Sequence, residues 1–149
     1  MEALVVQSGR CLDEGSHFPL LAPVTNKDIR STLFSNENDK ALGPDGFSSY
    51  FFKKSWEVIG DDFFFAIRDF FSSGQLLRQV NHSIIALVPK SVNVSSPSDF
   101  LPISCYNVIY KVISKILAGR MATTLQDIIN SAQNAFLNGR FMFDNIHLM

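Results

Sequence analysis

The sequence predicts an α+β fold in which helices dominate and one small antiparallel hairpin supplies the strands. Most of the chain places apolar residues at helical spacing, with polar residues between them. One stretch departs from that pattern, because two short apolar runs, Ile84–Val88 and Phe100–Ile103, flank a loop rich in Ser and Asn. The two strands are expected at Ile84–Val88 and near Leu101–Ser104. With 149 residues, 46% of them hydrophobic, the chain can bury the core of one domain.

The first regular element is expected after an irregular start. Residues 1–19 are predicted to form an irregular N-terminal segment, and prolines near its end oppose regular structure. Thr25 and Asp28 have the spacing of a capping box, with Asp in place of the usual Glu. They predict a short helix that runs through Leu33.

A tight turn is expected at Gly43–Gly46. Pro44 presets φ for the turn, Asp45 can accept a local hydrogen bond, and the glycines tolerate positive φ. Ser48 follows at the right distance to cap the next helix, which is expected over residues 48–59.

Gly60 is expected to end that helix, and a new one is expected from Asp61 to Gly74. Asp61 and Asp62 are adjacent acids, and paired carboxylates can hold two metal ions. Acidic residues are also favoured at helix starts, where they cap backbone N–H groups and meet the helix dipole. Capping is the favoured interpretation of this pair.

The fourteen phenylalanines predict a large aromatic core, or one part of a larger core. Most of those in the two central helices share one helix face, whereas Phe65 points off that face. Exposed apolar surface of this kind drives association. Self-association through exposed apolar surface is therefore expected.

The last part of the chain is helical again. An apolar stripe starts at Val108, and a further helix is expected around Met121. Lys111 and Lys115 lie four residues apart on the opposite face, and Arg120 lies near their end. Such a row can contact RNA phosphates, although the spacing alone favours a solvated helix face.

Composition excludes several classes of protein. The net charge of −1 gives the chain no global attraction to nucleic acid. The charge is uneven, however, because residues 1–47 carry −3 and residues 80–149 carry +2. A polyanion site is therefore expected in the second half of the chain. Cys11 and Cys105 fit no metal spacing and no disulfide framework. No apolar run reaches the length of a membrane span, and no secretory leader is visible. An intracellular protein without membrane contact is therefore expected, in a compartment that the sequence does not indicate.

A series of short blocks runs through residues 20–149 in a fixed order. KALGPDGF stands at Lys40–Phe47, IALVPK at Ile85–Lys90 and DFLPIS at Asp99–Ser104. Together with blocks in Gln133–Asn145, they resemble the reverse transcriptases of plant non-LTR (LINE-type) retrotransposons in both order and spacing. The residues that carry the family motifs are Gly43, Pro44, Asp45, Gly46, Pro102, Ile103, Ser104, Gly139, Arg140, Asp144 and Asn145.

The resemblance implies the fingers portion of a right-hand polymerase, as a partial reverse transcriptase domain over residues 20–149. In that family a lysine and an arginine on the two arms of the hairpin contact the triphosphate of the incoming nucleotide. The resemblance places the lysine at Lys90 and puts Leu101 where the arginine would stand. Leucine cannot bond a phosphate, so one charge-assisted contact is expected to be lost.

The resemblance also implies a chain that is not catalytic by itself. The metal-binding aspartates of the family stand in palm blocks expected beyond residue 149, so no catalytic residue, metal ligand or cofactor is assigned here; the full-length family would need Mg²⁺. The chain is interpreted as a truncated reverse transcriptase fragment derived from a retrotransposon. The alternatives are a non-catalytic module that weakly binds RNA or template-primer, and an inert product of a decayed retroelement.

Overall fold

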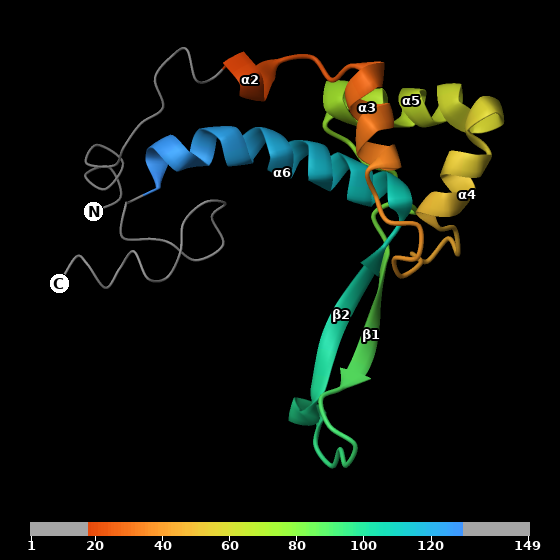
Figure 1. Ribbon diagram of the computed structural model, residues 1–149, viewed down its shortest axis with the longest axis vertical. Helices are drawn as coiled ribbons and strands as arrows, with labels where there is room; N and C mark the ends of the chain where they lie inside the picture. Colours follow the sequence, from red (N-terminus) through yellow and green to blue (C-terminus); the bar gives the residue numbers. More distant parts are fainter. Residues whose placement is uncertain (1–17, 130–149) are drawn as a thin grey trace. The chain divides into compact units, whose positions relative to one another are not determined.

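The computed structural model describes residues 18–129, and these residues form an α+β fold, as predicted (Figure 1). Residues 24–116 make one compact unit, and the described residues 18–23 and 117–129 belong to a second. The elements in chain order are α2 (Phe18–Leu21), α3 (Asn26–Phe34), α4 (Ser49–Lys54), α5 (Trp56–Ser73), β1 (Ser83–Pro89), the 3₁₀ turn η2 (Pro97–Asp99), β2 (Phe100–Tyr106) and α6 (Val108–Ile128).

Local signals at the helix ends are confirmed. The Thr25 hydroxyl accepts a hydrogen bond from the Asp28 N–H, and the Asp28 carboxylate accepts from the Thr25 N–H at 2.9 Å, which completes the predicted capping box. Ser48 caps α4 by accepting from the Phe51 N–H. Gly74 ends α5 with φ at 70°, a left-handed conformation that favours glycine.

The predicted break at Gly60 is wrong. The helices separate earlier, at Ser55, and α5 runs through Gly60 without interruption. A Cβ at residue 60 would lie 3.1 Å from the Trp56 ring, so this glycine allows close packing of an aromatic side chain within the helix. Asp61 and Asp62 therefore lie inside α5, and their interpretation as caps is wrong because no helix begins there.

The C-terminal helices are also continuous where a division was expected. α6 extends from Val108 to Ile128 as one helix, so Met121 does not belong to a separate one. In the region expected to be irregular, Phe18–Leu21 forms a single helical turn. The segments at Gly139–Arg140 and Asp144–Asn145, including the expected last helix, lie outside the described residues.

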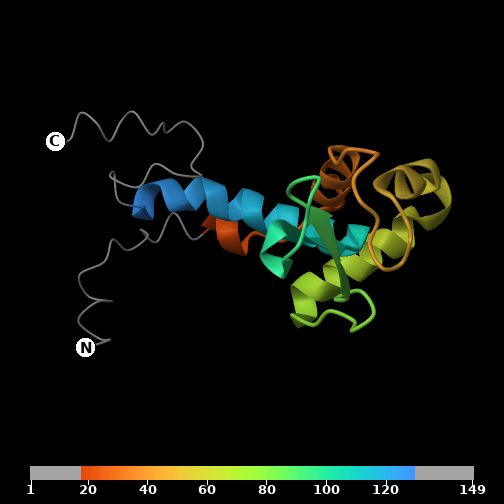
Figure 2. The same cartoon turned by 90° about the horizontal axis from the view of Figure 1, so that it is seen from below.

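The core of residues 24–116 lies where α3, α5 and the first part of α6 meet, and Figure 2 shows the first turns of α6 between α3 and α5. Each helix contributes residues at a spacing of three or four, which places them on one face. The buried members are Ile29 and Leu33 from α3, Phe63 and Ile67 from α5, and Val108, Val112, Ile113 and Ile116 from α6.

Aromatic rings extend this core on the side of α4. Trp56 lies at their centre, with ring centroids 5.7 Å from Phe34, 5.9 Å from Phe63 and 5.1 Å from Phe64, all in edge-to-face geometry. Phe65 is 70% exposed, which confirms that it points off the shared face. Self-association through surfaces of this kind stays a prediction.

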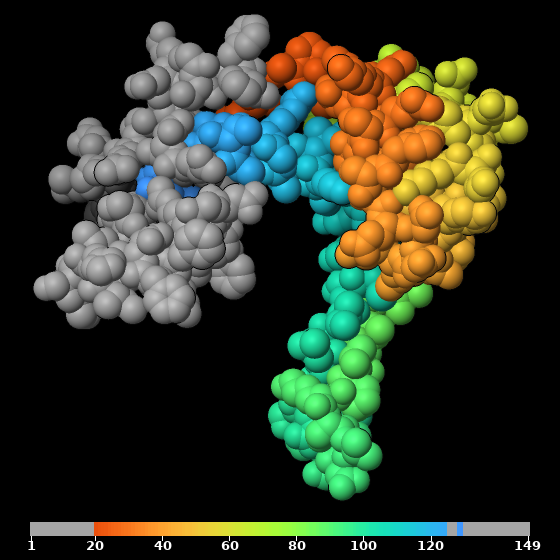
Figure 3. Space-filling view, viewed as in Figure 1, coloured from red at the N-terminus to blue at the C-terminus, as the bar shows by residue number. Residues whose placement is uncertain are grey.

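β1 and β2 pair as the predicted antiparallel hairpin, which extends away from the helices of residues 24–116 (Figure 3). Pro89 lies opposite Phe100, and Pro102 lies opposite Leu87. The Lys90 N–H donates to the Asp99 carbonyl at 2.8 Å, and hydrogen-bonded pairs alternate along an antiparallel ladder. Both prolines therefore occupy positions whose backbone nitrogen faces away from the partner strand, where the missing N–H costs no ladder bond.

Candidate functional site

The end of the hairpin brings together the two positions that the sequence singled out. Leu101 lies directly opposite Val88, and Lys90 follows two residues after Val88 with its backbone bonded to Asp99. Directly opposed residues share a face of a sheet, so Lys90 and Leu101 are diagonal neighbours on one face. Both side chains are exposed.

The loop after Lys90 is held by its own hydrogen bonds. The Lys90 ammonium donates to the Ser98 carbonyl at 2.8 Å. The Asp99 carboxylate accepts from the backbone N–H groups of Ser95 at 3.0 Å and Ser96 at 2.9 Å. These two bonds favour the charged carboxylate and hold the pKa of Asp99 below its usual range. The loop that carries the cation is thus locally ordered.

The Gly43–Gly46 segment forms the predicted tight turn. The Gly46 N–H donates to the Gly43 carbonyl at 3.0 Å, and the Asp45 carboxylate accepts from the Phe47 N–H at 3.0 Å. Gly46 has φ at 76°, so one of the two glycines needs the left-handed region. Gly43 is needed for a different reason, since a Cβ there would lie 2.6 Å from the Cα of Asn107.

Asn107 is the residue on which this turn docks, and its role was missed from the sequence. Its side-chain carbonyl accepts from the Asp45 N–H at 3.2 Å, and its amide donates to the carbonyls of Gln79 at 3.2 Å and Val80 at 3.3 Å. Asn107 thereby joins the turn, the segment before β1 and the start of α6. The available signal was an asparagine directly between a strand and a helix, a position at which a side-chain amide commonly satisfies backbone groups.

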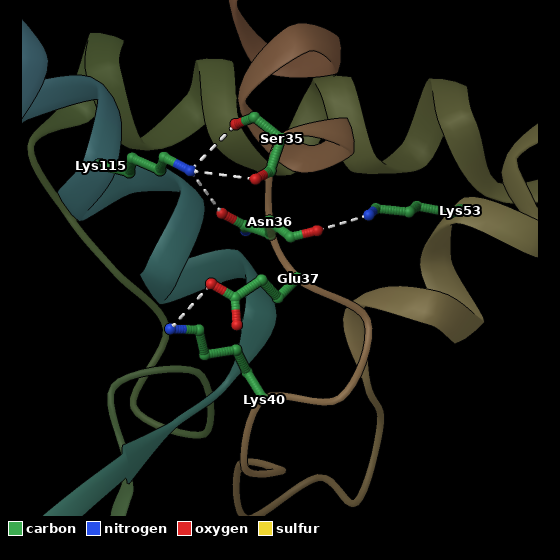
Figure 4. A network of polar contacts seen from close by, with 6 residues as sticks. All are labelled: Ser35, Asn36, Glu37, Lys40, Lys53 and Lys115. Carbon is green, nitrogen blue, oxygen red and sulfur yellow. Dashed lines mark hydrogen bonds and ion pairs between the residues drawn. The ribbon is translucent and has the colours of Figure 1, made fainter.

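Lys111 and Lys115 lie on one side of α6, and both contact the polar loop before the turn. Lys111 donates to the Ala41 carbonyl at 2.5 Å. Lys115 donates to the Ser35 hydroxyl at 3.0 Å and to the Asn36 side-chain carbonyl at 3.1 Å (Figure 4). The two ammonium groups therefore hold the loop over residues 35–41, a role that spacing alone did not reveal.

Lys53 of α4 completes this network from the other side of the loop (Figure 4). Its ammonium donates to the Asn36 carbonyl at 2.5 Å and to the Asn38 side-chain oxygen at 2.8 Å. Arg120 belongs to the second unit, where its guanidinium donates to the Leu20 carbonyl at 3.2 Å.

Three further properties belong to the described residues. Within residues 18–129, no group of three or more His, Cys, Asp or Glu side chains lies close enough together to hold a metal ion. No helix in the same range has the length and apolar character needed to cross a membrane. Cys105 is buried with a free thiol.

No protein-family model matches the chain. The chain is similar to the transposon TX1 uncharacterized 149 kDa protein of Xenopus laevis, with 27% identity over 130 residues. The match covers 87% of this chain and 10% of that protein, so the chain spans about a tenth of the length of the relative. This similarity supports a protein derived from a transposon.

Proposed function

We propose that residues 20–149 are the fingers region of a reverse transcriptase from a non-LTR (LINE-type) retrotransposon, of the kind found in plants. The blocks of the family occur in order along the chain, and the transposon relative matches 130 residues of it. The observation that carries the proposal is the register of the hairpin, in which Lys90 and position 101 lie on one face. Two side chains that contact one triphosphate need to lie on the same face.

The nucleotide contact of this chain is expected to be weak. Lys90 supplies one cation, which in the free protein donates to the Ser98 carbonyl and would exchange that partner for a phosphate oxygen. Leu101 offers no donor. A hydrogen bond between charged partners contributes about 1.5–3 kcal/mol, so the missing arginine removes a substantial part of the affinity.

Restoring the arginine is therefore expected to strengthen triphosphate binding. Leu101→Arg should lower the dissociation constant for a deoxynucleoside triphosphate by about 10- to 150-fold, because one charge-assisted contact is regained. Titration followed by NMR shifts at Lys90 measures the change.

Val92→Arg is the matched control, since Val92 is 98% exposed in the loop of the same hairpin. It adds the same charge at a position that has no cross-strand partner. Equal strengthening by both variants would contradict a paired site and indicate only a general charge effect.

We further propose that the 149-residue chain does not polymerise by itself. None of the family blocks in residues 20–149 is a palm block, and polymerisation needs palm carboxylates that hold two metal ions. A primer-extension assay with magnesium or manganese is expected to give no product above a no-protein control. Extension that disappears in an Asp61→Ala, Asp62→Ala variant would overturn this proposal.

Weak RNA binding through Lys111, Lys115 and Arg120 is a second candidate function, favoured by the charge of +2 in residues 80–149. About three phosphate contacts predict a shallow slope, near −2 to −3, of log affinity against log salt. Replacing both lysines with glutamine should weaken RNA binding in a filter assay, and glutamine retains donors for the loop over residues 35–41.

Lys27→Gln is the control for the RNA assay, because Lys27 is exposed at the start of α3. Thermal melts of all three proteins separate a lost phosphate contact from a displaced loop. If the double variant binds RNA as the parent does, the lysines serve only to hold the loop.

A further inference from the structure

An apolar cavity of about 160 Å³ lies where the end of α5 meets the segment before β1 and the start of α6. Its apolar lining consists of Phe65, Ala66, Leu76, Leu77, Val80 and Ile109. For comparison, a cavity of about 150 Å³ with similar lining binds benzene in another protein. The volume therefore suits one bulky apolar side chain, such as that of phenylalanine or leucine.

Two of the apolar residues that line this cavity are exposed to solvent. Phe65 is 70% exposed and Leu77 is 72% exposed, although both line the cavity. Val58 is 84% exposed and lies seven residues before Phe65, which places the two side chains on the same outer face of α5. The cavity thus lies at one end of a strip of the α5 surface that carries the exposed apolar side chains Val58 and Phe65.

Acidic side chains accompany that strip. Asp61 and Asp62 lie about one turn before Phe65, and Asp69 lies about one turn after it, so all share its face at helical spacing. The three aspartates are exposed, and in the described part of the chain their carboxylates have neither an ion pair nor a hydrogen bond. Asp69 also lines the cavity. Neither the caps expected of Asp61 and Asp62 nor the nucleotide-facing hairpin explains these charges.

We propose that this face of α5 and its cavity dock a basic amphipathic helix of another protein. Such a helix would insert one bulky apolar side chain into the cavity and present Lys or Arg about one turn on either side of it, opposite the aspartates. The strip from Val58 to Asp69 is about 17 Å long, which matches about three turns of a partner helix. Charge complementarity favours this partner over RNA, whose phosphates the three carboxylates repel.

A synthetic helix-forming peptide provides the probe. It carries a phenylalanine at its centre and lysines three and four residues before it and four residues after it, on an alanine and glutamine background. The anisotropy of a labelled peptide, titrated with the whole chain, is expected to saturate. Replacing the central phenylalanine by serine should weaken binding by about 10- to 150-fold, the equivalent of burying one such side chain. Replacing the lysines by glutamates should abolish binding.

Variants of the chain test each part of the site. Asp61→Asn with Asp62→Asn should weaken peptide binding by about 2- to 30-fold, as expected for two exposed ion pairs. Leu77→Ser should weaken it through the cavity rim. The matched controls are Asp39→Asn and Val92→Ser, which change an exposed acid and an exposed valine elsewhere in residues 24–116. Circular dichroism verifies that all variants keep the helix content of the parent.

Specific outcomes would overturn the proposal. Absence of saturable binding to the parent chain, or equal weakening by the controls, would show that the face holds no basic helix. Sedimentation that reveals dimers of the chain, abolished by Phe65→Ser, would assign the face to a second copy instead. The result is independent of the hairpin, since Leu101→Arg alters neither α5 nor the cavity lining.

Discussion

Replacing Ile67 with alanine is expected to lower the free energy of unfolding by about 2–5 kcal/mol. Ile67 has no exposed surface and lies in the core shared by α3, α5 and α6. The substitution removes its contacts and leaves a cavity that the surrounding helices close only in part. Because a domain has a net stability of about 5–15 kcal/mol, this single change should remove a large share of it.

Urea denaturation followed by circular dichroism measures the loss. Val58→Ala is the control on the same helix, since Val58 is 84% exposed and its truncation should change stability by about 0.5 kcal/mol or less. A comparable loss in the two variants would mean that the face of α5 with Ile67 is not the buried one.

Asn107→Ala is expected to cost about 3 kcal/mol. The alanine leaves the carbonyls of Gln79 and Val80 and the N–H of Asp45 without their partner, and one unsatisfied buried group costs about 1–3 kcal/mol. All three hydrogen bonds are partly buried, so water replaces them incompletely. The same denaturation experiment measures the change, and Asn93→Ala in the exposed hairpin loop is the control.

A double-variant cycle identifies the docked turn as the cause. Gly43→Ala should also destabilise the chain, because its Cβ would lie 2.6 Å from the Cα of Asn107. If the turn rests on Asn107, the combined loss should be smaller than the sum of the single losses. Additive losses would show that the two residues act independently.

The elements that the sequence predicted correctly are those specified by neighbouring residues. The Thr25–Asp28 capping box, the turn at Gly43–Gly46 and the helix end at Gly74 each depend on a side chain or backbone preference within four residues. The hairpin was predicted from two β-branched or apolar runs around a polar loop, and its prolines were compatible with the edges of a two-stranded sheet.

The elements that the sequence did not predict depend on tertiary contacts. Glycine often ends a helix, yet Gly60 lies inside α5. A glycine is needed there because the Trp56 ring occupies the space that a side chain at residue 60 would fill. α6 likewise continues through Met121, where a separate helix was expected. The break assigned to Gly60 and the division before Met121 were both wrong.

The sequence indicated which hairpin positions lie near each other, but it did not indicate which groups the lysines of α6 contact. The hairpin register joins Lys90 and position 101 through a ladder that the two apolar runs suggested. In contrast, Lys111 donates a hydrogen bond to Ala41, which is 70 residues away in the sequence. Lys115 donates to Ser35, which is 80 residues away. No local pattern distinguishes a lysine that holds a loop from one that faces solvent.

The prolines of the hairpin have a consequence for aggregation. Within residues 24–116, the two-stranded ribbon stands away from the helices, and both of its outer edges are open to a strand from another molecule. Pro89 and Pro102 each remove one outward backbone donor, one on either edge, so an added strand would lack a hydrogen bond on whichever side it approached. Each proline thereby disfavours the edge-to-edge stacking of strands that leads to amyloid.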